Sequence, residues 1–163
     1  MAEFKKRELD RLDRNILHAL QQDARISYVD LAEKVGLSST PCIERVKRLE
    51  KDGYIEGYYT RLNPKALGYG MLVFVEISLS YQSPDAFQTF NQAVSRLPYI
   101  LECHLVSGDA DYLLKARIED MSEYRALLGD MLLTLPGVKH SKSYIVMEEV
   151  KETQELPLTS ASR

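Results

Sequence analysis

The sequence predicts an α+β protein in two parts, a helical N-terminal unit and a C-terminal βαββαβ unit. Apolar residues between Asp13 and Gly53 recur at helical spacing, whereas residues 71–150 alternate strand-like runs with two helical patterns. The stretch Leu62–Gly70, with one proline and two glycines, separates the two patterns. The expected boundaries are a helical domain at 9–62, a linker at 63–70, a second domain at 71–150 and a tail at 151–163.

The first two helices have recognisable ends. A first helix is expected over residues 10–22 or 13–22, with its apolar side chains on one face. A second is expected over Tyr28–Val35, because Ser27 is a favourable N-cap and Gly36 a favourable C-terminal stop.

The third helix follows a tight turn. Its start offers three hydroxyl-bearing caps and a proline in the first turn, namely Ser38, Ser39, Thr40 and Pro41. One face is apolar, through Cys42, Ile43, Val46 and Leu49. The remaining surface carries Glu44, Arg45, Lys47, Arg48 and Lys51. Two helices joined by a glycine-containing turn form a helix-turn-helix, whose second helix reads the major groove of DNA. The alternative is an ordinary helical subdomain with a solvated charged face.

After Gly53 the pattern becomes extended. Tyr54–Thr60 is rich in strand-favouring residues, and Gly57 is compatible with a tight turn or a bulge. We expect a small strand pair here, which would make the N-terminal unit winged-helix-like.

The C-terminal half predicts a ferredoxin-like βαββαβ domain. Its strands are expected at 72–79, 100–106, 112–118 and 138–147, with helices after Ser83 and after the capping-box signature Asp120–Glu123. Because the helices cover only one face of such a sheet, the apolar strands also predict a second sheet packed against the first, and hence a dimer.

Charge and cysteine usage limit the class of protein. The net charge is −3, but residues 1–65 carry +2 and residues 66–163 carry −5, which suits a DNA-facing part followed by a more acidic part. The start of the chain is polar and no apolar run is long enough to cross a membrane. Cys42 and Cys103 lack metal-site spacing, so we expect reduced thiols in a cytoplasmic protein.

No catalytic or metal-binding motif is present, so neither an enzyme nor a metal site is expected. The exception worth weighing is the pair Asp109 and Asp111 in a glycine-led loop. They form either an ordinary turn of polar residues or a carboxylate site for the ammonium group of an amino acid.

Four motifs in the same order resemble the Lrp/AsnC family, over about Leu9 to Lys151. They are Leu37–Glu50, Gly53–Ile55 with Leu62–Pro64, Glu102–Lys115 and Tyr144–Lys151. The resemblance implies a transcriptional regulator, activating or repressing, with a helix-turn-helix, a linker and a ligand-binding domain that dimerises through its sheets. It also implies assembly of dimers into octamers that wrap or bridge double-stranded DNA, and a response to leucine or a similar amino acid as effector, with no other cofactor. The alternative is a nucleoid-associated architectural protein with little sequence preference.

Residue by residue, the resemblance places the recognition helix nearest DNA through Ser38, Ser39, Thr40, Pro41, Glu44, Arg45, Lys47 and Arg48. It places the effector between dimers, at Leu105, Gly108, Asp109, Asp111, Met121, Tyr144, Ile145 and Val146. The chain departs from the family pattern at Ser39, at Ala110 and in the tail from Glu152.

Overall fold

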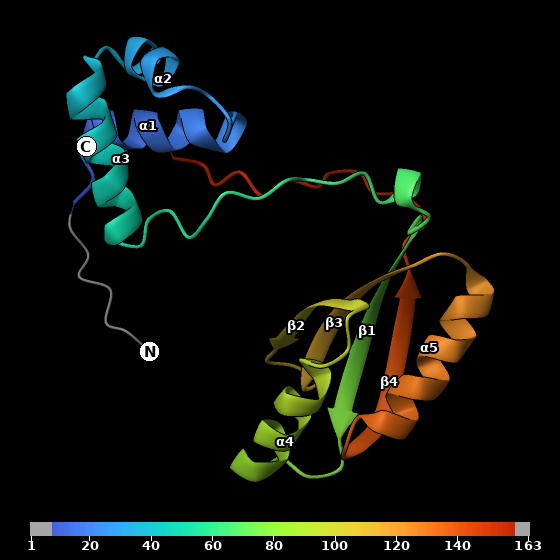
Figure 1. The fold of residues 1–163 in the computed structure, drawn as a ribbon. Coiled ribbons are helices and arrows are strands. Elements are labelled where there is room, and N and C mark those ends of the chain that lie inside the picture. The colour runs from blue at the N-terminus through green and yellow to red at the C-terminus, as the bar shows by residue number, and fades with distance from the viewer. Residues whose placement is uncertain (1–7, 159–163) are drawn as a thin grey trace. The chain divides into compact units, whose positions relative to one another are not determined.

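The computed structural model describes residues 8–158, without the side chains of residues 127, 128 and 130–133. The chain forms two compact units. One contains the N-terminal residues up to Arg61 together with the chain from Glu152 onward, and the other contains Leu62–Lys151. Each unit is built around its own hydrophobic core. Figure 1 shows their elements.

The N-terminal unit consists of α1 (Arg11–Gln22), α2 (Tyr28–Val35) and α3 (Ser39–Lys51). The predicted second helix is confirmed in both bounds. The hydroxyl of Ser27 accepts the Asp30 N–H, and Gly36 ends the helix in the left-handed conformation with φ of 72°. The three helices bury a common core, chiefly Ile16, Leu31, Cys42, Val46 and Leu49.

The predicted strand pair after Gly53 is wrong. No strand is assigned between α3 and the short 3-10 helix Lys65–Leu67, within the part of the chain that is described. The N–H groups of Tyr54 and Ile55 both point back to the Leu49 carbonyl, at 2.9 and 3.3 Å. Strand-favouring side chains do not make a strand without a neighbouring backbone to pair with, and this segment is tied to the end of α3 instead.

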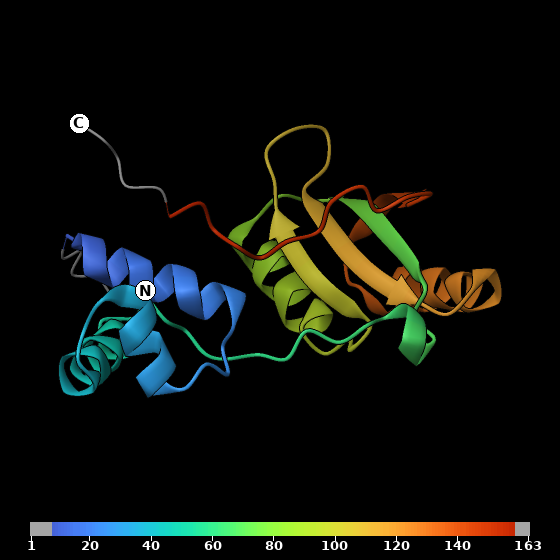
Figure 2. The ribbon, with the colours of Figure 1, turned by 90° about the horizontal axis from the view of Figure 1, so that it is seen from above.

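The C-terminal unit has the predicted βαββαβ order. Its elements are β1 (Met71–Leu79), α4 (Pro84–Val94), β2 (Ile100–Leu105), β3 (Tyr112–Ile118), α5 (Met121–Thr134) and β4 (Val138–Ile145). The four strands form one antiparallel sheet in the order β2-β3-β1-β4. Figures 1 and 2 show α4 and α5 against one face of this sheet.

The apolar face of the sheet is covered by the chain's own helices. Val73, Val75 and Ile77 alternate along β1 and are buried with Phe90 of α4, whose ring stacks on Tyr112 at 4.3 Å. The apolar alternation of β1 therefore faces the helices. The other face of the sheet includes Leu72, Phe74 and Leu113, and the dimer through that face stays a prediction.

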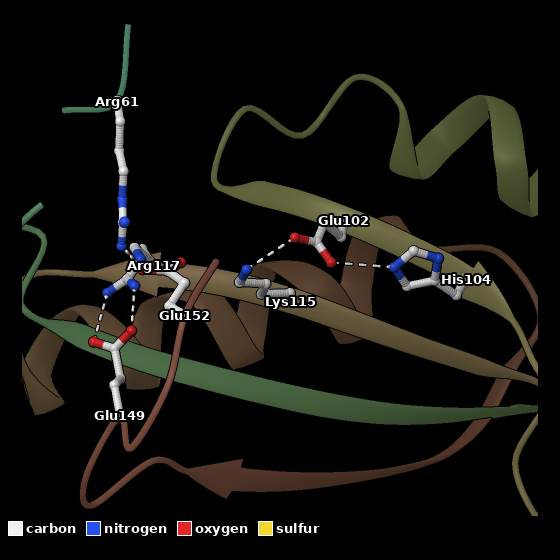
Figure 3. Close-up of polar contacts among 7 residues, drawn as sticks. All are labelled: Arg61, Glu102, His104, Lys115, Arg117, Glu149 and Glu152. Carbon is white, nitrogen blue, oxygen red and sulfur yellow. Dashed lines mark hydrogen bonds and ion pairs between the residues drawn. The ribbon is translucent and has the colours of Figure 1, made fainter. Parts of the chain in front are cut away.

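That face also carries two groups of polar contacts (Figure 3). Lys115 donates to Glu102 at 2.8 Å, and Glu102 also lies 3.2 Å from the His104 ring. Lys115, and then His104, lower the pKa of the Glu102 carboxyl. The guanidinium of Arg117 makes two hydrogen bonds to Glu149, which lowers the pKa of that carboxyl. His104 is thus a satisfied sheet histidine.

Among the described residues, no helix is both long and apolar enough to cross a membrane.

Candidate DNA-binding and effector sites

One side of α3 is open along its length. Cys42, Val46 and Leu49 bury the opposite side against α1 and α2. Of the residues predicted to approach DNA, the exposed ones are Ser38, Thr40, Pro41, Glu44 and Lys47. Lys51 extends the same exposed side by one turn. The remaining predicted residues, Ser39, Arg45 and Arg48, are half-buried.

The two arginines of α3 are held by α1. Arg45 donates to the carboxylates of Asp10 at 2.6 Å and Asp13 at 2.7 Å. Arg48 donates to Asp13 at 2.9 Å. Asp13 is only 1% exposed, so this ion pair network is anchored on a buried carboxylate. The hydrogen bond to Asp10, and next the hydrogen bond to Asp13, raise the pKa of Arg45 above its ordinary value.

Asp10 and Asp13 are not among the site residues predicted from the sequence. The three-residue spacing of these aspartates is typical of a helix N-cap, and Asp10 does cap α1: its carboxylate accepts the Asp13 N–H at 2.8 Å. No local signal shows that Arg45 and Arg48, 32 and 35 residues farther along, are the partners of Asp13.

The predicted carboxylates of the effector loop have different environments. Asp111 is 8% exposed, and its two oxygens accept the Leu79 N–H at 2.7 Å and the Gln82 side-chain amide at 2.8 Å. It therefore fastens the β2–β3 loop to the end of β1. Asp109 is exposed, next to Gly108, whose φ of +140° suits glycine. Gln82 was another residue that the sequence analysis missed.

The predicted effector residues fall into two groups at opposite ends of the sheet. Leu105 pairs with Tyr112, which pairs with Ile77, and the loop with Asp109 and Asp111 follows at that end. Ile145 pairs instead with Val73, four residues away on β1 or about 13 Å of extended strand.

Met121 belongs to this second group. It begins α5 three residues after Ile118, which pairs with Met71 at the first residue of β1. Tyr144 and Val146 flank Ile145 in the same group. The predicted effector residues of one chain therefore form two groups. They are here called the loop half, with Leu105, Gly108, Asp109 and Asp111, and the β4 half, with Met121, Tyr144, Ile145 and Val146.

The described side chains include no group of three or more His, Cys, Asp or Glu that could hold a metal ion. Burial raises the pKa of the Cys42 and Cys103 thiols, which favours unreactive, protonated thiols.

Comparison with known proteins matches both units. Residues 72–156 match the Lrp/AsnC ligand binding domain, and residues 9–56 match a winged helix-turn-helix DNA-binding domain. The chain is 58% identical over 159 residues to the leucine-responsive regulatory protein of Klebsiella pneumoniae, covering 96% of this chain and 97% of that protein.

Solved structures agree. An L-methionine complex of a Neisseria meningitidis transcriptional regulator matches with a TM-score of 0.88 at 36% identity, over 93% of this chain and 97% of that one. An AsnC family transcriptional regulator from Agrobacterium tumefaciens also gives 0.88, at 39% identity over 92% and 97%.

The three-helix unit, the βαββαβ unit and these matches agree with one another. The chain belongs to the Lrp/AsnC family of DNA-binding transcriptional regulators and is not an enzyme.

Proposed function

We propose that this chain binds promoter DNA through α3 and that leucine or a similar amino acid changes that binding, so that transcription is activated or repressed. The observation that carries the proposal is the open side of α3, whose residues are short, polar or cationic and whose opposite side is buried. Such a helix can enter the major groove without unpacking the unit that presents it.

The DNA contacts divide into two kinds. Lys47 and Lys51 lie on the exposed side and suit phosphate contacts, while Thr40 and Glu44 are placed to meet base edges. Arg48 keeps 37% of its side chain exposed although it is bound to Asp13. Its guanidinium is thereby held in one orientation before DNA arrives, which reduces the entropy lost on binding.

The effector is proposed to sit between copies of the chain, because its two half-sites are at opposite ends of one sheet. The loop half of one chain would meet the β4 half of another. The family's dimers and octamers provide such a junction, and several weak DNA contacts then act together. The effector shifts the assembly only as far as it binds one arrangement better than another. We place this assembly in the cytoplasm, on the nucleoid.

The first test is capture of sheared genomic DNA by the purified protein at physiological salt, with and without leucine. A limited set of promoters whose occupancy changes with leucine is the expected result. Even capture across the genome that ignores leucine would instead favour the architectural alternative.

Replacing Lys47 with alanine should weaken binding to promoter and random DNA by the same factor. Each lost phosphate contact removes about one released counterion, so the slope of log affinity against log salt should fall by about 1. Fluorescence anisotropy over a salt series measures this. Lys139→Ala removes the same charge from an exposed position on β4 and serves as the control. A loss confined to one sequence would contradict the phosphate role and assign Lys47 to a base.

Replacing Asp109 with asparagine should weaken leucine binding by about ten- to a hundredfold, because a hydrogen bond to a charged group contributes about 1.5–3 kcal/mol. Calorimetric titration with leucine measures this. Asp23→Asn makes the same charge change on an exposed carboxylate outside the proposed site and is the control. Asp111→Asn is the comparison within the site: the Gln82 amide can rotate to offer its oxygen to the new side-chain amide and preserve the loop, so leucine binding should fall less than in Asp109→Asn. The reverse result, with loss at Asp111 only, would make Asp111 the ammonium partner.

A further inference from the structure

The chain beyond β4 returns to the DNA-binding unit. Residues 152–158, here called the strap, are grouped with the three helices rather than with the sheet. Glu152 pairs with Arg61 at 2.9 Å (Figure 3), and Leu158 packs half-buried against the helical core. Between them, Leu156 is held by Gln21 of α1.

The bond between Gln21 and Leu156 resembles a strand pairing. The Leu156 N–H donates to the Gln21 Oε1 at 2.7 Å, and the Gln21 Nε2 donates to the Leu156 carbonyl at 3.2 Å. An extended residue presents its N–H and C=O on the same side, and the side-chain amide of glutamine offers a matching acceptor and donor. Pro157 favours the extended conformation at Leu156.

This contact is made by backbone rather than by side chain at Leu156. The Leu156 side chain itself is 68% exposed, whereas Leu158, two residues later, packs against the core of the three helices. The strap is thus held on the helices at two points, the two-bond amide clamp at Leu156 and the apolar anchor at Leu158, while the Arg61–Glu152 ion pair is largely exposed and adds little.

Because the strap belongs to the N-terminal unit, the chain crosses between the two units twice. Residues 62–70 lead into the sheet, and residues 146–151 lead from β4 back to the strap. The second connection starts directly at the β4 half of the proposed effector site, which ends at Val146. The contact with α1, at Leu156, lies ten residues beyond Val146, so one short segment joins the β4 half to the first helix.

We propose that the strap is an intramolecular docking segment on α1 that couples the end of β4 to the DNA-binding unit. Its docking follows from the contacts alone. Its role in transmitting the effector signal rests on the proposed function.

The test uses the full-length protein and two pairs of variants. Gln21→Glu keeps the size of the side chain and the acceptor for the Leu156 N–H, but sets a second oxygen against the Leu156 carbonyl. Gln22→Glu makes the same charge change on the next residue, which is exposed and bonded to His18 and Lys34 instead. Leu158→Ala removes the apolar anchor, and Leu156→Ala is its control because the clamp uses backbone atoms.

Hydrogen exchange followed by mass spectrometry reports docking of the strap. We expect the Leu156 amide, followed in peptides that span residues 153–158, to exchange about tenfold faster in Gln21→Glu and Leu158→Ala and at the wild-type rate in both controls. Exchange of these amides at the free-chain rate in the wild-type protein would overturn the docking.

DNA affinity with and without leucine reports the coupling. In the two strap variants the leucine-induced change should shrink several-fold while leucine affinity is kept. If hydrogen exchange shows that the strap is released and leucine still changes DNA affinity as much as in the wild type, the coupling is overturned. Wild-type DNA affinity that ignores leucine and related amino acids would overturn the proposed effector role, and hydrogen exchange would still decide whether the strap docks.

Discussion

Replacing Asp13 with alanine is expected to destabilise the N-terminal unit by about 2–4 kcal/mol, because removing one partner of a buried ion pair leaves the other charges uncompensated. Asp13 is 1% exposed and is shared by Arg45 and Arg48. These arginine side chains are 23% and 37% exposed, so water can take over part of their solvation. The expected loss therefore stays below the upper end of the range for fully buried pairs.

Because the two units can unfold separately, the measurement should report on the helices. Urea-dependent hydrogen exchange of α1 and α3 amides does so. Asp10→Ala is the matched control. Its carboxylate is 45% exposed, and its loss removes mainly a helix cap and a partly solvated ion pair, for an expected cost of about 1 kcal/mol. Equal effects of the two substitutions would contradict the anchoring role of Asp13.

Asp13→Ala should also weaken DNA binding beyond what unfolding explains. The guanidinium of Arg48 would no longer be held in one orientation, so more side-chain entropy is lost on contact with DNA. DNA affinities measured for the folded fraction separate this loss of affinity from the effect of unfolding. Folded protein that binds DNA with unchanged affinity would mean that the network supports the fold alone.

The second large effect concerns the proposed effector site. Two variants, Asp109→Asn in the loop half and Tyr144→Ala in the β4 half, should each bind little leucine when assembled alone, at a leucine concentration that just saturates the wild type. Coexpressed in equal amounts, they should recover about one quarter of the wild-type leucine capacity, because random assembly in a symmetric oligomer joins two native halves in that share of sites. Calorimetric stoichiometry at a leucine concentration that saturates the wild type measures the recovery.

This recovery distinguishes a shared site from a site within one chain, because in the second case every chain would carry one damaged half. No recovery in the coexpressed sample, with mixed assembly verified by differently tagged chains, would therefore contradict a shared site. Coexpression of two chains that both carry Asp109→Asn provides the baseline.

The sequence by itself determined the elements whose causes are local. The ends of α2 follow from Ser27 and Gly36, since a cap and a left-handed glycine act on backbone groups within one turn. The alternation along β1 and the strand–helix order of the second unit follow from side-chain periodicity, which is equally local. The same locality explains the failure after Gly53, because a strand requires a distant partner that its own residues do not specify.

Only the tertiary structure decided which distant groups meet. The crossing of α1 and α3 joined Asp13 to two arginines that the helical pattern assigned to open surface. Antiparallel pairing of β1 with both β3 and β4 sent the loop at Asp109 and the residue Ile145 to opposite ends of the sheet. Docking of Leu156 on Gln21 returned the tail to the first helix across 135 residues. These outcomes depend on burial and on pairing between remote segments, which one-dimensional periodicity does not encode.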